Sequence, residues 1–509
     1  MRICLFLDRS RIFRWHEWLA ATLAGKADHV VSATFASESY PLPTSCNLAF
    51  TLERLIYSRR PEHAMDAVKT SDLKHTNDNA DEGPFDIVVD LDGQSDELPP
   101  CNRVLTPLFN SIPGEIGAIS AIMHDHPLHI HINDSAAVAQ GMAARPAMSD
   151  RQVLLLALDG VLSRAVELIA RLIDNDIGHI DDGYRHHRFL RPHAHTSTPR
   201  SAIAHVTHVL TGKVVSRLQR MMTGEQTWAT AYRFDNAAPL LDTYRASFAV
   251  LPDDMRRYFA DPFPCEYQGQ RFIFVEEFPF ATGRGCISVF AIGRDGTPAR
   301  ARVVLDEPHH LSFPYLFEHE GQMWMIPESA DEKRVDLYRA EDFPYRWTRE
   351  GSLLEGIAAY DSTLLKHDGH FWLLASLGHW QSTSWDNLCI FHAPTLTGPW
   401  TAHSGNPVLI DAMHSRAAGT PFWHNNELLR PVQDCTRIYG GAVTINRILS
   451  LNDADFRQVP VGRITCNMPG CHTYNRRGGL EVIDIFGITR GRTHVSASYR
   501  PLAASDTPH

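Results

Sequence analysis

The sequence predicts two kinds of domain in one chain: an α/β domain with a doubly wound parallel sheet, followed by an all-β domain that forms a five-bladed β-propeller. Two observations predict this. Strand-like and helix-like segments alternate through the first part of the chain, and a strand–turn–strand unit recurs five times after residue 232. We therefore expect an α/β domain over 1–150, a helical linker region over 151–231 and the propeller over 232–495.

The first domain is predicted from near-continuous apolar strands that alternate with segments of helical periodicity. Such strands are typical of a parallel sheet buried on both faces. The polar segment Lys69–Gly83 predicts a mobile surface insert. In order, the expected elements are the strand Met1–Leu7, the helix Phe13–Ala24, the strand His29–Phe35, the helix Phe50–Tyr57, the strand Phe85–Asp92, the helix Glu115–His124 and the strand Leu128–Asn133.

The region between the two domains contains two stretches with helical periodicity. Arg151–Asp174 predicts a long helix, and Ala202–Met222 predicts a second one after the polar stretch His179–Arg200. We expect these helices to pack against the chain's own domains. The alternative is a surface that pairs two copies in a homo-oligomer.

The propeller is predicted from a repeat of an apolar strand, a tight turn and an aromatic strand. Its turn positions are separated by 52, 48, 57 and 52 residues and are occupied by Gly269, Gly321, Gly369, Asn426 and Gly478. Glycine and asparagine fit the left-handed conformation of such turns. Five copies of about 50 residues are typical of a five-bladed propeller. A β-sandwich with chance similarity is the alternative.

Acidic side chains recur at fixed distances from these turns. Eight residues before each turn stand Asp261, Phe313, Asp361, Ala418 and Gly470, and seven or eight residues after them stand Glu276, Glu277, Glu328, Gln433 and Asp434. Because the inner strands of a propeller line a central channel, Asp261 and Asp361 are expected to converge. Clustered acids suit work on sugars, so Asp261, Asp361 and Glu328 are the candidate catalytic residues. The alternative is that the two aspartates only cap turns.

Other polar and aromatic residues near the same ends are candidates for binding substrate. An arginine can grip phosphate or carboxylate, and aromatic rings can stack on sugar faces. No cofactor or metal is expected, although a cation centred on histidine is an alternative. The candidate substrate-binding residues are His310, Trp380, Arg416, Gln433, Asp434, Tyr439 and His472.

Composition excludes several classes of protein. The chain has 509 residues, 21% of them charged, and a net charge of −11 without a long basic block, so a nucleic-acid partner is not expected. No apolar run is long enough to predict a transmembrane segment. Nine cysteines, an odd number, argue against a disulfide framework, and we expect a cytoplasmic protein.

Residues from about 232 to 490 resemble a known family, the propeller domain found in plant glucosamine inositolphosphorylceramide transferases and in bacterial relatives. In the plant proteins the recognised transferase domain is a separate one, so this resemblance alone leaves a non-catalytic glycan-binding module open. The matching motifs are Ala260–Phe263, His310–Tyr315, Met325–Ser329, Leu337–Ala340, Phe343-Pro344, Trp347, Gly398–Trp400, Asn406-Pro407, Arg416–Gly419, Gln433–Cys435 and Tyr439-Gly440.

The propeller is also similar, more distantly, to the arabinanase and invertase superfamily. That resemblance implies a base or nucleophile at Asp261 and a carboxylate that tunes pKa at Asp361. The glutamate that serves as the catalytic acid in that superfamily has no counterpart in this sequence, because Ala418 and Gly419 occupy its position. Glu328 can replace it, or an acidic leaving group such as phosphate needs no proton, which favours transfer or phosphorolysis over hydrolysis.

The first 150 residues resemble, more weakly, the N-terminal domain of formyltransferases. The shared features are the strand Phe85–Asp92 and the segment Val104–Asn133. The nearest candidates for that family's catalytic residues are Asn110, His124 and Asp134, but their surroundings do not match the family motif. We expect a degenerate domain that binds, scaffolds or pairs.

Together these features predict a transferase that moves a sugar onto a cell-surface glycan or glycolipid precursor. Its expected partners are a sugar donor, with a nucleotide sugar as one form, and a glycan or glycolipid acceptor. The alternatives are formyl or related one-carbon transfer to an amino sugar by the first domain, a non-catalytic glycan-binding module and a glycoside hydrolase.

Overall fold

The computed structural model describes residues 1–57, 62–73, 84–94, 97–136, 143–174, 205, 207, 209, 211–212, 227–234, 238–488 and 492–502. Internal contacts divide the chain into two compact units. Unit 1 comprises Met1–Arg217 together with His379–Thr383, and unit 2 comprises Leu218–Gly378 and Ser384–Thr507. Each unit is described by itself.

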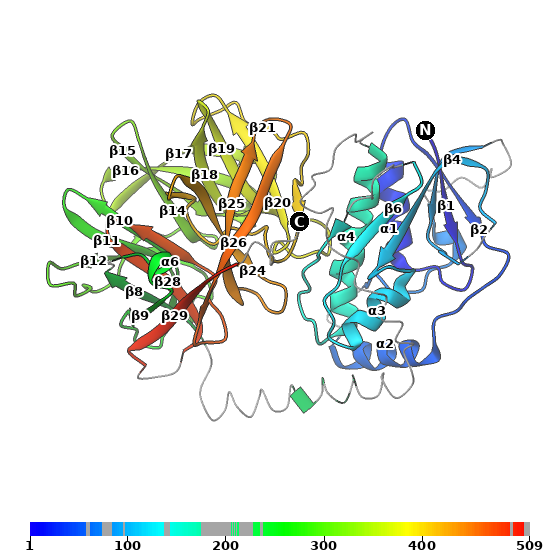
Figure 1. The fold of residues 1–509 in the computed structure, drawn as a ribbon, viewed down its shortest axis with the longest axis horizontal. Coiled ribbons are helices and arrows are strands. Elements are labelled where there is room, and N and C mark those ends of the chain that lie inside the picture. The colour runs from blue at the N-terminus through cyan, green and yellow to red at the C-terminus, as the bar shows by residue number, and fades with distance from the viewer. Residues whose placement is uncertain are drawn as a thin grey trace. The chain divides into compact units, whose positions relative to one another are not determined.

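Unit 1 contains a mixed sheet in the strand order β2-β1-β3-β4-β6-β7, with β5 paired to β4. Strands β1, β2, β4 and β6 of this sheet are labelled in Figure 1. The first four of these strands run parallel, whereas β6 is antiparallel to β4, and β5 and β7 also pair in antiparallel fashion. The bounds are β1 Arg2–Leu7, β2 Val30–Phe35, β3 Phe85–Asp90, β4 Cys101–Phe109, β5 Ile112–Pro113, β6 Ile130–Asp134 and β7 Ala143–Ala144.

The antiparallel part of the sheet departs from the parallel sheet expected from the sequence. Asn110 and Ser111, directly after β4, have φ values of 51° and 66°. This left-handed turn reverses the chain into β5, so β4 is not followed by the long crossover that a parallel neighbour requires. The alternation of apolar segments cannot reveal such a reversal.

The helices of unit 1 are α1 (Arg14–Ala24), α2 (Thr44–Tyr57), α3 (Glu115–Met123) and α4 (Leu154–Asp174), with a 3₁₀ turn at Thr70–Asp72. Helix α4 packs against α1, α2 and α3, and Leu155, Leu158, Leu162 and Ile169 on it are buried. The stretch expected to begin the linker region is therefore part of the core of unit 1. Most of the second expected helix and of the polar insert lies outside the described residues.

Unit 2 is built from antiparallel sheets. Three of them follow the chain in order, and the fourth has the order β23-β24-β25-β26-β29-β9-β8-β28-β27. The first sheet holds β10 Arg257–Tyr267, β11 Gln270–Pro279, β12 Cys286–Ile292 and β13 Arg302–Leu305. The second holds β14 Ser312–His319, β15 Gln322–Glu328, β16 Arg334–Asp342 and β17 Arg346–Glu355. The third holds β18 Ala359–His367, β19 His370–Leu377, β20 Asn387–Ala393, β21 Thr401–Ala402 and β22 Leu409–Ile410.

The fourth sheet joins the fourth and fifth sequence repeats and closes the unit on itself. Strands β28 and β29 near the end of the chain pair with β8 and β9 from the start of the unit. Short helices, α6 Leu240–Thr243 and a 3₁₀ turn Ala330–Glu332, lie between strands. The strands of the fourth sheet are β23 Phe422–His424, β24 Glu427–Asp434, β25 Ala442–Leu451, β26 Phe456–Cys466, β27 Tyr474–Arg477, β28 Leu480–Ile488, β29 His494–Pro501, β8 Thr227–Phe234 and β9 Arg245–Val250.

The five predicted turns are confirmed. Each lies between the two strands of a hairpin, and each has a positive φ, from 57° to 78°, at Gly269, Gly321, Gly369, Asn426 and Gly478. Because a left-handed residue suits a two-residue hairpin, the repeat in the sequence is a repeat of hairpins.

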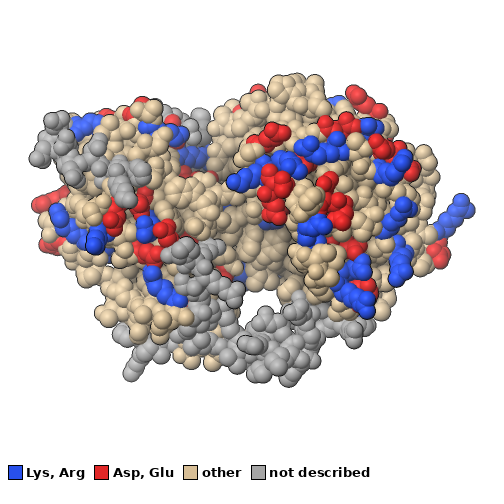
Figure 2. All heavy atoms as spheres, turned by 180° about the vertical axis from the view of Figure 1, so that it is seen from behind, with Lys and Arg blue, Asp and Glu red and all other residues tan. Residues whose placement is uncertain are grey.

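The described surface carries charges of both signs. On the face in Figure 2, lysines and arginines are interspersed with aspartates and glutamates. All nine cysteines are free thiols. Among the helices of the described ranges, none combines the length and the apolar character that crossing a membrane requires.

Candidate functional site

The site begins with an unusual backbone position that repeats in the first strand of three hairpins. Asp261 in β10, Phe313 in β14 and Asp361 in β18 have φ values of 48°, 43° and 49°. The pairing register shifts at each of them, between Ala260 and Phe263 in the first case. These are β-bulges, which redirect a side chain out of the regular alternation and store strain. Two of the three bulges present an aspartate.

The repeat position continues into the last two hairpins with different residues. It falls on Ala418 before β23, as the sequence predicts. In the fifth hairpin Arg477 pairs with Leu480, so the turn is Gly478-Gly479 and the position falls on Cys471 rather than on Gly470. Because Gly478 and Gly479 are both glycines, the sequence alone does not show which of them is the second residue of the turn.

Asp261 is almost completely buried and accepts several hydrogen bonds. Its Oδ1 accepts from Thr473 Oγ1 at 3.0 Å, and its Oδ2 accepts from the backbone N–H of Phe313 at 3.3 Å. Its own N–H donates to Asp484 Oδ2 at 3.3 Å. The first and last sequence repeats thus meet at Asp261.

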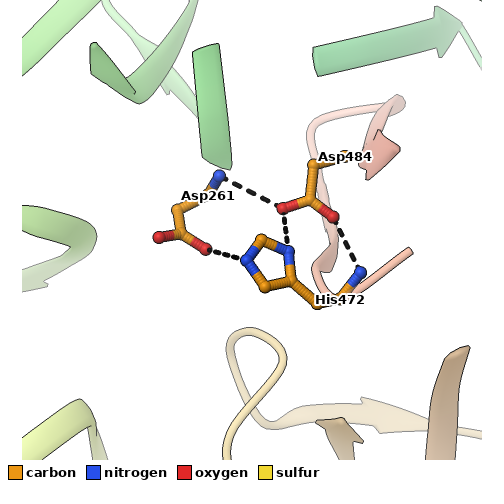
Figure 3. Close-up of side chains that lie close together, drawn as sticks. All are labelled: Asp261, His472 and Asp484. Carbon is orange, nitrogen blue, oxygen red and sulfur yellow. Dashed lines mark hydrogen bonds and ion pairs between the residues drawn. The ribbon is translucent and has the colours of Figure 1, made fainter. Parts of the chain in front are cut away.

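His472 lies between Asp261 and Asp484 (Figure 3). Its Nε2 is 3.5 Å from Asp261 Oδ1, its Nδ1 forms an ion pair with Asp484 Oδ2, and its backbone N–H donates to Asp484 Oδ1 at 2.8 Å. Burial opposes the charged imidazolium, but Asp484 and Asp261 outweigh it and raise the pKa of His472. The ring of Trp228 stacks on the imidazole with 4.0 Å between centroids. The imidazole is therefore fixed on both edges and on one face.

Asp361 is held by two donors from the fourth repeat. Arg416 Nε donates to its Oδ2 at 2.5 Å, and Gln433 Nε2 donates to the same oxygen at 2.9 Å. Gln433 also donates to the carbonyl of Ala417 at 2.8 Å, and Arg416 Nη1 donates to Ser384 Oγ at 2.9 Å. This carboxylate is a buried, charge-paired anion.

Two glutamates complete the cluster from the second strand of their hairpins. Glu276 pairs with Ala260 in the ladder and Glu328 pairs with Ser312, so both stand beside a bulge. Glu328 accepts from Ser312 Oγ at 3.0 Å and from the N–H of Ala330 at 3.1 Å. We call Asp261, Glu276, Glu328 and Asp361 the acid cluster.

Burial and mutual repulsion raise the pKa of three members of the acid cluster. Burial, with Asp361 and Asp484 adding to it, raises the pKa of Asp261 to about 6, although His472 opposes this. Burial and the charge of Asp361 raise the pKa of Glu328 to about 7, against Arg416. Burial, Asp261 and Glu328 hold the pKa of Glu276 well above its usual range. Groups that titrate near neutrality suit general acid–base catalysis.

Half-buried aromatic rings surround the acid cluster and contact Glu276, Arg416 or His472, or one another. Tyr258 Oη lies 3.4 Å from Glu276 Oε1, and the guanidinium of Arg416 lies over the rings of Tyr360 and Tyr439 at 5.5 and 5.1 Å. We call Trp228, Tyr258, Tyr360, Trp385 and Tyr439 the aromatic rim. Such rings can stack on a sugar while buried carboxyls act on it.

Most of the predicted binding residues lie at this cluster. Arg416 and Gln433 hold Asp361, and His472 holds Asp261. His310 is 30% exposed, and its Nε2 is 3.6 Å from Glu276 Oε1. The ring of Tyr439 lies 5.2 Å from both the imidazole of His472 and the indole of Trp385.

Two predicted binding residues lie elsewhere. Asp434 pairs with Arg463 at 2.6 Å and caps Thr436, because alternation along β24 directs it away from Gln433. Trp380 belongs to unit 1, where its ring packs edge-on against Trp18 at 5.9 Å. A loop residue such as Trp380 carries no strand periodicity, so counting from turns could not place it.

The sequence reasoning missed Asp484, Thr473 and Trp228. Asp484 lies six residues after Gly478, which is off the register of the other acids, and its strand β28 pairs with β8 from the start of the unit. Trp228 belongs to that same first strand, which lies before the first repeat. Tyr360 could be predicted as a site residue from the sequence, because it directly precedes the candidate Asp361.

One group of described residues has the arrangement of a metal site. The potential ligand atoms of Asp261, His472 and Asp484 all lie within 4.8 Å of one another. Both ring nitrogens of His472 already face carboxylate oxygens, so a cation could bind only if the histidine gave up its proton and its ion pairs. The residues fit an ion-paired triad better than a metal centre.

The candidates for formyltransferase chemistry in unit 1 each serve local structure. Asn110 exchanges hydrogen bonds with the carbonyl of Pro127 and the N–H of His129, both at 2.8 Å. His124 Nδ1 contacts the Ser120 carbonyl at the end of α3, and Asp134 forms a two-point ion pair with Arg103. The likeness to formyltransferases stays a prediction.

Comparison with known proteins gives one family. The family model described as Glucosamine inositolphosphorylceramide transferase 1, N-terminal, matches residues 209–478, more than half of the chain. A protein of Oryza sativa subsp. japonica named Glucosamine inositolphosphorylceramide transferase 1 is 34% identical over 209 residues, 40% of this chain and 28% of that protein. Its namesake from Arabidopsis thaliana is 32% identical, over 40% of this chain and 27% of the relative. The chain thus spans less than a third of these relatives.

Solved structures show weaker likeness. A family 117 glycoside hydrolase, Zg3597 of Zobellia galactanivorans, is 12% identical with a TM-score of 0.33 over 49% of this chain and 91% of its own. An α-L-arabinanase of Cellvibrio cellulosa is 13% identical with a TM-score of 0.29 over 39% of this chain and 76% of its own. The family assignment rests on the sequence match over residues 209–478, which confirms the resemblance seen in the repeat motifs: this chain belongs to the family described as Glucosamine inositolphosphorylceramide transferase 1, N-terminal.

Proposed function

We propose that this chain is a carbohydrate-active enzyme that transfers a glycosyl group to a glycolipid or to a cell-surface glycan precursor. Its active site is the acid cluster, at the axis of a five-bladed propeller whose fourth and fifth blades share one sheet. The observation that carries the proposal is that Asp261 and Glu328, with pKa values of about 6 and about 7, both experience the charge of Asp361, which is itself held by Arg416. The cytoplasmic location expected from the sequence stays part of this proposal.

The names of the relatives indicate which substrates to try first. They couple glucosamine with inositolphosphorylceramide. We therefore take an activated amino sugar as the first donor and a lipid that carries inositol phosphate as the first acceptor.

The proposed mechanism gives a role to each member of the site. Asp261, fixed by His472, accepts the proton of the acceptor hydroxyl as that oxygen bonds to the sugar carbon and the bond to the leaving oxygen breaks. Asp361 supplies fixed negative charge beside a developing oxocarbenium ion. Arg416 Nη2 makes no hydrogen bond to a described residue, so it can bind a phosphate oxygen of the leaving group.

Glu328 completes the proposed mechanism. With a pKa of about 7 it is substantially protonated at neutral pH. It can donate this proton when the leaving group is a sugar alcohol, whereas a phosphate leaves without one. Transfer from an activated donor is preferred because its phosphate leaving group needs no proton from the protein. Hydrolysis remains the alternative, in which Glu328 supplies the proton to the leaving sugar.

The test is an assay of the full chain with nucleotide sugars and inositol-phosphate lipids, following product by mass spectrometry. Asp261→Asn and Asp361→Asn are expected to lower turnover at least 1,000-fold, on the order seen for essential groups. Asp336→Asn is the matched control, because Asp336 is equally buried and paired with Arg334 and Arg349, but lies on β16 away from the acid cluster.

The outcomes separate the alternatives. Donor consumption without acceptor product indicates a hydrolase. Saturable binding of sugar without turnover indicates a glycan-binding module. Wild-type turnover in Asp261→Asn refutes the proposed site.

A further inference from the structure

Arg430 in β24 is a buried cation that lacks a counter-charge. It is 1% exposed, and among the described residues no carboxylate forms an ion pair with it. Its Nη atoms donate to neutral oxygens, the carbonyls of His414 and Ser415 and, weakly, Gln458 Oε1. Its Nε has no hydrogen-bond partner. Burial alone lowers the pKa of Arg430 to about 9, a sign of uncompensated charge in a side chain that stays protonated in proteins.

Buried polar groups without partners stand beside this cation. Asn446 is directly opposite Arg430 in the ladder, is fully buried, and has no partner at either amide atom. Thr444, two residues away on the same face of β25, is 2% exposed and has an unpartnered Oγ1. Cross-strand pairs of this kind lie within contact distance.

The face that carries these groups packs against the third sheet. Val443 and Ile445, which alternate with Thr444 and Asn446, belong to the core on the opposite face, whereas Ile448 packs in the core that contains Trp372 and Leu374. Thr363, paired with Leu374, lies on the facing surface of the third sheet. It is fully buried and its Oγ1 is also unpartnered.

Buried donors almost always have partners, and a buried charge requires compensation. A water molecule can satisfy the amide and the hydroxyls, but it cannot neutralise a guanidinium. The available donors are Arg430 Nε–H, Asn446 Nδ2–H and the two threonine hydroxyls. We propose that a small monovalent inorganic anion binds between the third and fourth sheets of unit 2, against Arg430, Asn446 and Thr444, and joins the two sheets.

The test uses the full chain and halide ions as probes. Thermal unfolding is followed in sodium chloride, sodium bromide and sodium gluconate at a common ionic strength of about 0.15 M, gluconate being too large to enter. Chloride and bromide are expected to raise Tm by about 3 °C over gluconate through binding to the folded state. In Arg430→Met this difference disappears, and in Thr444→Val, which keeps the charge, about tenfold more halide is needed.

A crystal grown or soaked in bromide supplies a readout that does not depend on folding of the variants. An anomalous peak within hydrogen-bond distance of Arg430 Nε supports the proposal. Only water density at that place, or the same halide effect in wild type and Thr444→Val, overturns it.

Discussion

Arg416 and Asp361, which are 55 residues apart in the chain, form a hydrogen-bonded ion pair at 2.5 Å, and both side chains are almost completely buried. Removing one partner of such a pair leaves a buried charge, which costs about 3–5 kcal/mol of unfolding free energy. Arg416→Met is therefore expected to lower stability by that amount in urea unfolding. Arg339→Met, which breaks the exposed pair with Glu350, should cost less than about 1 kcal/mol.

The double variant Asp361→Asn/Arg416→Met separates pairing from packing. Because it removes both charges, it is expected to lose clearly less stability than the two single variants summed. Additive losses would show that the ion pair contributes nothing.

Glu328 predicts a pH dependence of stability. The folded protein holds its proton up to about pH 7, whereas the unfolded chain releases it near the usual glutamate value of 4.5. The stabilisation is fully present below pH 4.5 and is lost as pH rises toward 7, by about 3 kcal/mol at most. In Glu328→Gln, urea unfolding between pH 5 and 8 should show a smaller fall than in wild type. An identical pH profile would exclude a raised pKa.

Asp484 predicts a change in the pH profile of activity. Without Asp484 the imidazolium of His472 loses its ion pair and gives up its proton more readily. Asp261 then loses the positive charge that lowers its pKa, and this outweighs the loss of the negative charge of Asp484, which raises that pKa by a smaller amount. Asp484→Asn is expected to lower kcat/KM about 10–100-fold and to move its acidic limb to higher pH. A uniform loss with an unmoved profile would mean that Asp484 serves folding alone.

The core position of helix α4 predicts that unit 1 depends on this helix for its stability. Leu158 is fully buried on α4, which packs against α1, α2 and α3, so Leu158→Ala should lower the free energy of unfolding by about 2–5 kcal/mol. Hydrogen exchange should increase in peptides of α1 and α4 while those of β10 to β12 keep their protection. Equal effects in both units would contradict the assignment of α4 to unit 1.

The sequence was sufficient to predict the site residues that occupy repeated positions. The left-handed turns predicted five hairpins, and counting from them placed Asp261, Asp361 and Glu328. Repetition says nothing about the residues that break it. Asp484 lies off the register, Trp380 lies on a loop, and Asp434 points to the opposite face from Gln433 although the two are neighbours in the chain.

The fold of unit 1 shows the same limit. The strands near Leu5 and Val88 were predictable from their apolar runs, but β4 was not, because its alternation of buried and half-exposed residues is interrupted by polar side chains. The reversal at Asn110 depends on two left-handed residues that no hydrophobic pattern reveals.

Because β28 pairs with β8, the proposed active centre is complete only when the last strands of unit 2 are in place. Asp261 lies near the beginning of unit 2, and His472 and Asp484 lie in its last hairpins, so nearly all of unit 2 must be synthesised before the three side chains can meet. A product that stops before residue 484 would contain most of the strands of unit 2 but not the completed triad of Asp261, His472 and Asp484.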